Sequence, residues 1–242
     1  MQPGDYQVGN KKPTIDSGAQ QSYHGMMRNG ATRRASLLYG ADLTRKNYMC
    51  DRWPRMTKEQ INACPIRKYQ GRIQLIQESE QVEQAVRELE KETVLGFDTE
   101  TRPTFRVGQH YPPAVLQLAG EQAVYVFQLK HCRLSKALRR LLVNPKIIKA
   151  GVALDRDVQE LNKLAPFKPA GFVDVGELAK QAGCRNHGIR GLATQLLGFR
   201  VSKNCQTSNW AKKTLTRAQI EYAATDAWVG RELYHKLQEL LP

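Results

Sequence analysis

The sequence has few cysteines, no long apolar run and a shortage of acidic residues. Its five cysteines are scattered over 242 residues and never form a Cys-x-x-Cys pair, a pattern that predicts no zinc site and suits a reducing compartment. No stretch approaches the roughly 18 uninterrupted apolar residues of a membrane-spanning helix, and the polar start lacks the apolar core of a signal peptide. We therefore expect a soluble, cytoplasmic protein with no membrane partner.

The shortage of acidic residues leaves a strong positive charge. There are 37 Lys and Arg against 23 Asp and Glu, a formal net charge of +14. Such a charge attracts polyanions at long range and gains from the release of their counterions. Nucleic acid is therefore the leading candidate partner. The 41% hydrophobic content is enough for the core of an ordinary globular domain.

Composition divides the chain near residue 55. Residues 1–55 carry few large aliphatic side chains and many Gly, Ser, Asn and Gln, with nine basic residues against four acidic ones. This composition is typical of a flexible basic arm. The remaining residues, 56–242, are expected to form one α/β domain that is basic in its own right.

From residue 72 onward, short apolar runs alternate with amphipathic segments, which predicts a central sheet covered by helices. The expected strands are 72–76, 93–100, 114–119, 123–127 and 147–152. The expected helices are 79–91, 135–143, one reaching residue 164, one that begins at Asp174, and a last one from Thr216 to about residue 241.

Two acids stand at the tip of the expected central strand. Asp98 and Glu100 follow the apolar run 94–97. Positions i and i+2 of a strand point to the same side, so both carboxylates would converge while Thr99 faces away. Taken alone, this pair is equally compatible with solvated acids at a strand end.

Two further acids, Asp155 and Asp157, begin the helix that follows the strand 147–152. They lie roughly 200° apart around a helix, so they would not both face one site. Asp155 is expected to cap this helix, which leaves Asp157 as the candidate ligand. Capping by either residue is the structural alternative.

The last helix contains Tyr222 and Asp226. Their i, i+4 spacing places a phenol and a carboxylate side by side on one face. In isolation this pair is an ordinary helix surface.

In combination, the order Asp-x-Glu, Asp, Tyr-x-x-x-Asp resembles the DEDD superfamily of 3′-5′ exonucleases, in the subgroup whose last motif carries tyrosine. The resemblance covers about residues 72–240. Further stretches resemble the ribonuclease D and Werner-type exonuclease branch: Ala114–Leu118, Ala150–Val152, Leu196–Gly198, Lys203 and Ser208–Trp210.

This resemblance implies a ribonuclease H-like fold, with a mixed central sheet flanked by helices, and an enzyme that removes nucleoside monophosphates from the 3′ ends of DNA or RNA, single-stranded or frayed. It also implies two divalent cations, Mg²⁺ or Mn²⁺. Like charges 4 Å apart repel by about 4 kcal/mol at an effective dielectric of 20, so a pocket of carboxylates favours bound cations. The implied metal ligands are Asp98, Glu100, Asp157 and Asp226, and Tyr222 would orient the attacking water.

The resemblance also suggests substrate contacts. Three residues would border the terminal base and sugar: Thr101, Leu116 and Gln117. Three others would contact phosphate or shape the strand channel: Lys203, Asn209 and Trp210. The alternatives are that Leu116, Gln117 and Trp210 belong to the core and that Lys203 is merely solvated.

Three other functions compete with this interpretation. The first is a catalytically silent nucleic-acid-binding module of the same fold, and the second is a nuclease for very short oligonucleotides. The third is a tyrosine-assisted phosphoesterase acting on small molecules, for which the large positive charge would serve no purpose. The basic loop 101–105 and the doubled Asp155/Asp157 are departures from the family pattern, and the sequence makes no choice between DNA and RNA.

Overall fold

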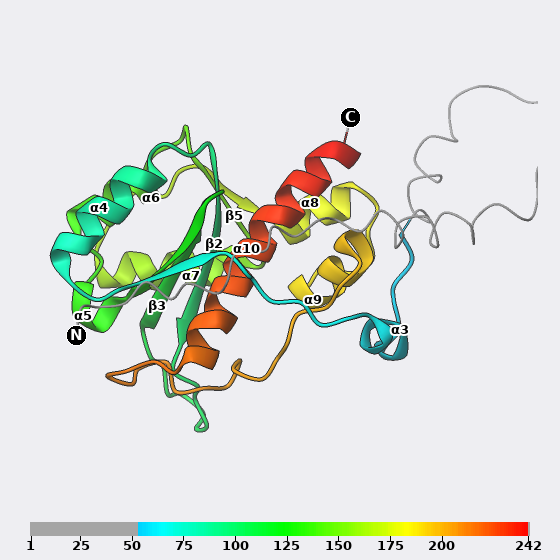
Figure 1. Ribbon diagram of the computed structural model, residues 1–242, viewed down its shortest axis with the longest axis horizontal. Helices are drawn as coiled ribbons and strands as arrows, with labels where there is room; N and C mark the ends of the chain where they lie inside the picture. Colours follow the sequence, from blue (N-terminus) through cyan, green and yellow to red (C-terminus); the bar gives the residue numbers. More distant parts are fainter. Residues whose placement is uncertain (1–52, 242) are drawn as a thin grey trace, which may run out of the picture.

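The computed structural model describes residues 53–241, which form a mixed six-stranded sheet with helices on both faces (Figure 1). The strands lie in the order β1-β4-β3-β2-β5-β6. β3 is antiparallel to its neighbours β2 and β4, and the other pairs are parallel. The strands are β1 (Arg72–Ile76), β2 (Val94–Thr101), β3 (Pro113–Ala119), β4 (Ala123–Gln128), β5 (Ile148–Gly151) and β6 (Phe172–Asp174).

Helices lie in most connections between the strands, although β2, β3 and β4 follow one another without a helix, and helices also lie near both ends of the described region. Capping side chains start several of them: Thr216 makes a full capping box before α10, and Asp174 accepts hydrogen bonds from two backbone N–H groups of α8. The helices are α3 (Lys58–Ala63), α4 (Ser79–Leu89), α5 (Leu129–Cys132), α6 (Lys136–Leu142), α7 (Leu154–Leu164), α8 (Val175–Gln181), α9 (Ile189–Leu192), the π-helix η1 (Ala193–Leu197) and α10 (Arg217–Leu240).

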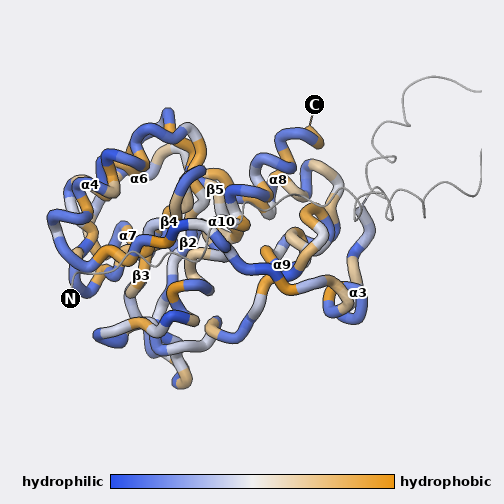
Figure 2. The backbone as a smooth tube through the Cα atoms, in the orientation of Figure 1, coloured by the Kyte–Doolittle hydropathy of each residue, from blue (hydrophilic) through white to orange (hydrophobic). Residues whose placement is uncertain are grey.

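The sheet separates two apolar layers. One face packs against α4, α5, α6 and α7, with Phe97, Leu116 and Phe127 fully buried between them. The other face is covered by α10, and α8, α9 and η1 pack beside that helix. Along α4 and α6, hydrophilic and hydrophobic residues alternate as expected for helices with one buried side (Figure 2).

The central strand β2 and helix α10 lie in direct backbone contact. Gly96 of β2 faces the helix, and a Cβ atom at this position would lie 1.9 Å from the carbonyl oxygen of Ala227. Only glycine therefore permits α10 to approach this closely. The next residue of β2 on the same face is Asp98, and the residue before Ala227 is Asp226, so this contact brings two acids together from distant parts of the sequence.

The predicted α/β fold with a mixed sheet and flanking helices is confirmed, and each expected strand and helix occurs within a few residues of its predicted bounds. The sequence analysis missed the short elements α3, α5, β6, α9 and η1, because three to six residues carry too little periodicity to be recognised. Within residues 53–241, no helix is both long and apolar enough to cross a membrane. The predicted arm, 1–55, lies outside the described residues except for its last three.

One prediction was wrong: Asp155 does not cap α7. The N-cap residue is Ala153, which adopts a left-handed conformation (φ 59°) as the chain turns out of β5, and no side chain caps the helix. The helix therefore begins at Leu154, and Asp155 lies exposed in its first turn.

Candidate active site

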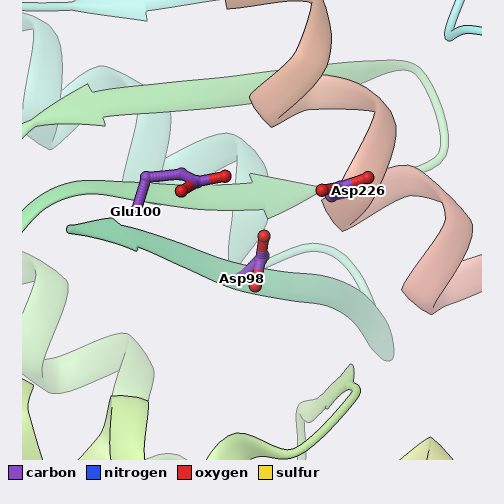
Figure 3. Close-up of side chains that lie close together, drawn as sticks. All are labelled: Asp98, Glu100 and Asp226. Atoms are coloured by element: carbon purple, nitrogen blue, oxygen red, sulfur yellow. The ribbon is translucent and has the colours of Figure 1, made fainter. Parts of the chain in front are cut away.

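Three carboxylates converge where β2 meets α10. Asp98 and Glu100 project from the same face of β2, as the i, i+2 spacing predicted, and Asp226 reaches them from α10 (Figure 3). One carboxylate oxygen from each of the three lies within 4.8 Å of those of the other two. The sequence predicted all three residues, but their proximity depends on the close contact at Gly96.

The surroundings of these three carboxyl groups favour their protonated, neutral forms. Burial, together with the nearby Asp226 and Asp157, holds the pKa of Asp98 well above its usual range. Burial and the charge of Asp98 raise the pKa of Glu100 to about 10. Burial raises the pKa of Asp226 to about 7, although the neighbouring Tyr222 hydroxyl partly opposes this shift. A compensating positive charge would allow all three carboxylates to ionise at neutral pH.

Asp157 approaches strand β2 from the opposite face of the sheet. It lies in the first turn of α7, and its Oδ1 accepts a hydrogen bond of 2.6 Å from the Thr99 hydroxyl. Burial raises the pKa of Asp157, and the Thr99 hydrogen bond partly opposes this shift. Asp157 is not one of the three converging carboxylates, but its charge raises the pKa values of Asp98 and Glu100.

Thr99 is a positioning residue that the sequence analysis overlooked. It was expected only to face away from Asp98, and it does so because side chains alternate along a strand. On that far face it is buried and donates to Asp157. A polar residue between two acids in an otherwise apolar strand was the available signal.

Tyr222 lies one helical turn before Asp226, as the i, i+4 spacing predicted. Its ring packs against Trp210, with ring centroids 6.0 Å apart at an angle of 44°. Burial, with the charges of Asp226 and Glu100, raises the pKa of the phenol far above its usual range. Tyr222 therefore keeps its proton and can act as a hydrogen-bond donor.

The predicted substrate-contact residues fall into two groups. Thr101, Lys203 and Asn209 are at least partly exposed, whereas Leu116, Gln117 and Trp210 are each 0% exposed. Leu116 belongs to the core on the α7 side of the sheet, and Trp210 belongs to the core beneath α10. The burial of these two side chains agrees with the core alternative, and their contact with a substrate stays a prediction.

Gln117 is buried but lies at the cluster. It is the cross-strand partner of Asp98, and neither its Oε1 nor its Nε2 has a hydrogen-bond partner within the described part of the chain. A buried amide without partners costs about 1 to 3 kcal/mol. Such a side chain beside the acids is available to a bound ligand or water.

Comparison with known proteins places this site in a family. The sequence profile of a family described as 3′-5′ exonuclease matches residues 73–242. The chain belongs to the 3′-5′ exonuclease family. The matched region contains all four acids and Tyr222.

Similarity to individual proteins supports the same family assignment. The chain is 34% identical over 153 residues to the mouse bifunctional 3′-5′ exonuclease/ATP-dependent helicase WRN, a match that covers 61% of this chain and 11% of that protein. Its fold is similar to the EXO domain of Aedes aegypti Nibbler (TM-score 0.64, 22% identity, 70% of this chain and 88% of that chain). It is also similar to Trypanosoma brucei RNase D in complex with RNA U12 (TM-score 0.60, 22% identity, 74% and 64%).

The chain spans only 11% to 26% of the length of the first three curated relatives that it matches. The shared region is therefore the exonuclease domain. The structural similarities, at 22% identity, show a common fold.

Proposed function

We propose that this chain hydrolyses phosphodiester bonds at the 3′ ends of nucleic acids, one nucleoside monophosphate at a time, as a member of the subgroup with tyrosine in its last motif. The main observation that supports this proposal is the convergence of Asp98, Glu100 and Asp226, whose carboxylate oxygens lie within 4.8 Å of one another. In the described residues, no salt bridge joins any of the three to Lys or Arg. The cluster thus has ligands to offer and no internal counter-charge.

The residues fit divalent cations. The donors are carboxylate oxygens, which are hard ligands that favour Mg²⁺ or Mn²⁺ over zinc. Asp226 Oδ1 is buried without a hydrogen-bond partner in the described region, as expected of a ligand atom. We assign metal binding to Asp98, Glu100, Asp157 and Asp226. Two such ions supply activation of water and stabilisation of the leaving oxygen when bound.

The surrounding residues position the reactants. Thr99 fixes the Asp157 carboxylate by the hydrogen bond of 2.6 Å. Tyr222 is assigned to orient the attacking water, since a protonated phenol beside Asp226 and Glu100 donates a hydrogen bond without serving as a base. Thr101 is proposed to border the terminal base and sugar, and the exposed Lys203 and Asn209 are proposed to contact phosphate or to shape the strand channel.

The substrate is proposed to be single-stranded or frayed DNA or RNA. The formal net charge of +14 favours a polyanion over a small phosphoester. An RNA complex of the structurally similar trypanosomal RNase D supports RNA as one substrate. We further propose residues 56–242 as the exonuclease domain and 1–55 as a basic arm.

The test is incubation of the purified chain with 5′-labelled single-stranded DNA and RNA in Mg²⁺, Mn²⁺ or EDTA. A ladder that shortens from the 3′ end, and that is lost in EDTA and in Asp98→Ala, is the expected result. Salt-sensitive binding without cleavage in either metal would support the silent binding module instead. Cleavage confined to strands of a few nucleotides would support the short-oligonucleotide nuclease.

Tyr222→Phe tests the role of the phenol. It should slow hydrolysis by about 10²-fold and leave strand binding nearly unchanged, because the ring still packs on Trp210 while the donor is lost. Tyr234→Phe is the matched control, a buried tyrosine three turns further along α10. Equal rates in the two variants would remove Tyr222 from the proposed mechanism.

A further inference from the structure

Two adjoining cavities lie where residues 55–62 pack against the segment 185–191, and Lys203 is the one residue of their described lining to which the proposed function gives a role. The larger has a volume of about 690 Å³ and the smaller about 380 Å³. No Asp or Glu is among the described residues that line the larger one. Its lining includes five basic residues: Arg55, Lys58, Arg185, Arg190 and Lys203.

Three of the five basic residues that line this basic pocket have no counter-charge in the described part of the chain. Within residues 53–241, Arg55, Lys58 and Lys203 form no ion pair or side-chain hydrogen bond. Arg190 donates from Nη2 to the neutral amide Oδ1 of Asn62 at 2.7 Å, and its Nε is buried without a partner. Cations gathered without carboxylates repel one another, so an anion in this pocket would be stabilising.

A second, independent observation also indicates a ligand. Asn186 lines both cavities and is 8% exposed, and its Nδ2 has no hydrogen-bond partner in the described structure. A buried N–H donor without an acceptor costs about 1 to 3 kcal/mol. The described lining of the pocket therefore holds a neutral donor without a partner and several cations, and it contains no carboxylate.

One turn of the chain, residues 203–206, separates the basic pocket from the active site. Gln206 N donates to the carbonyl oxygen of Lys203 at 3.1 Å, and the side chains of both residues line the pocket. Between them, Cys205 packs against the buried apolar cluster beneath α10, and Tyr222 packs against the same cluster. A strand held at the carboxylates thus has the basic pocket on the other side of a single turn.

We propose that this basic pocket binds the sugar-phosphate backbone of the substrate strand upstream of the bond that is cleaved, an inference that rests on the proposed exonuclease function. A phosphate supplies the missing acceptor and the missing negative charge. The volume of about 690 Å³ falls within the roughly 300 to 1,000 Å³ of small-ligand sites, which is enough for a nucleotide. Arg55 and Lys58 precede the family match at residues 73–242, so this segment extends the nuclease domain.

The test compares two double variants in an Asp98→Asn background, which prevents degradation of the probe. Arg55→Gln/Lys58→Gln removes two charges from the pocket, and both side chains are exposed, so the fold should persist. Lys146→Gln/Lys168→Gln removes two charges from exposed residues outside it. Fluorescence anisotropy measures binding of single strands of about 12 and about 3 nucleotides, and melting temperatures confirm folding.

The pocket variant should bind the longer strand about tenfold more weakly and lose about 1 to 1.5 from the slope of log affinity against log salt, with much less effect on the shorter strand. The control variant should change binding less than twofold. Equal losses in the two variants, or equal losses for long and short strands, would overturn the pocket proposal. Cleavage by the unmodified chain is scored separately, so the two failures are distinguishable: absence of cleavage would overturn the proposed function and with it the upstream position, whereas cleavage with no loss specific to the pocket variant would overturn the pocket proposal alone.

Discussion

Asp98 occupies a position that is unfavourable for a negative charge. Burial and the charges of Asp226 and Asp157 raise its pKa well above the usual range, so its ionised form destabilises the metal-free protein. The same carboxylate is proposed as a metal ligand. Removal of this charge should therefore raise the stability of the metal-free protein and lower its activity.

Asp98→Asn should abolish hydrolysis and stabilise the metal-free protein by about 1 to 2 kcal/mol, because a neutral amide avoids the charge repulsion. Thermal or urea unfolding in EDTA measures the stability. Asp155→Asn is the control, an exposed acid outside the cluster, and should alter neither property appreciably. A destabilised Asp98→Asn protein would show that the carboxylate has a structural role instead.

The raised pKa values also make the stability of the metal-free protein depend on pH. The pKa of Glu100 rises from 4.5 to about 10 and that of Asp226 from 3.8 to about 7 on folding. Between the unfolded and folded values the native state binds more protons than the unfolded state, so these groups make the native state less stable as pH rises.

Urea unfolding of the metal-free protein at pH 5 and pH 7.5 should show this loss as a fall of more than about 1 kcal/mol that is smaller in Glu100→Gln. The comparison with this variant isolates the cluster from other titrating groups, such as His235, whose pKa is lowered. Addition of Mg²⁺ should restore stability at pH 7.5. An identical pH slope in the two proteins would contradict the assignment.

At the scale of elements, the site depends on how closely α10 approaches β2. The helix contributes Asp226 and Tyr222, and the strand contributes Asp98 and Glu100. Gly96 permits the contact because its missing Cβ would meet the carbonyl oxygen of Ala227. A separation between the two elements would disperse the carboxylates even if every one of them were retained.

Gly96→Ala should destabilise the protein by about 2 to 4 kcal/mol and reduce hydrolysis, because the backbone of α10 must move away. Gly188→Ala provides the control, since a Cβ there meets nothing within 4 Å, and should change stability by less than about 1 kcal/mol. Denaturant unfolding and a cleavage assay measure the two effects. Equal stability in both variants would mean that the contact adjusts without cost.

At the scale of the whole molecule, charge is distributed unevenly. The acids of the site sit in a chain whose formal net charge is +14, and five basic residues line a pocket beside it. Long-range attraction can therefore bring a nucleic-acid strand to the protein, while the carboxylates receive only its end.

Binding of a single strand by Asp98→Asn should weaken at least tenfold between about 50 and 200 mM salt, because each phosphate contact releases counterions. It should persist in EDTA, since most of the attraction is independent of the metal. Anisotropy titrations across salt concentrations measure this response. A flat salt dependence would favour a small phosphoester as the substrate.

The order of the longer strands and helices followed from the sequence alone, because apolar runs and amphipathic segments predicted them. The i, i+2 spacing placed Asp98 and Glu100 on one face, and the i, i+4 spacing placed Tyr222 beside Asp226. These pairs became candidate site residues only through the family resemblance of their combined order. Elements of three to five residues, such as β6 and α9, were missed because they repeat no pattern.

Which distant residues come into contact became known only from the three-dimensional packing. The backbone contact at Gly96 joins β2 to α10, the Thr99 hydrogen bond fixes Asp157 from the far face of the sheet, and full burial assigns Trp210 to the core. The basic pocket likewise combines residues 55–62 with residues 185–206. These are contacts between segments tens to more than a hundred residues apart, and they depend on packing, which no local spacing encodes.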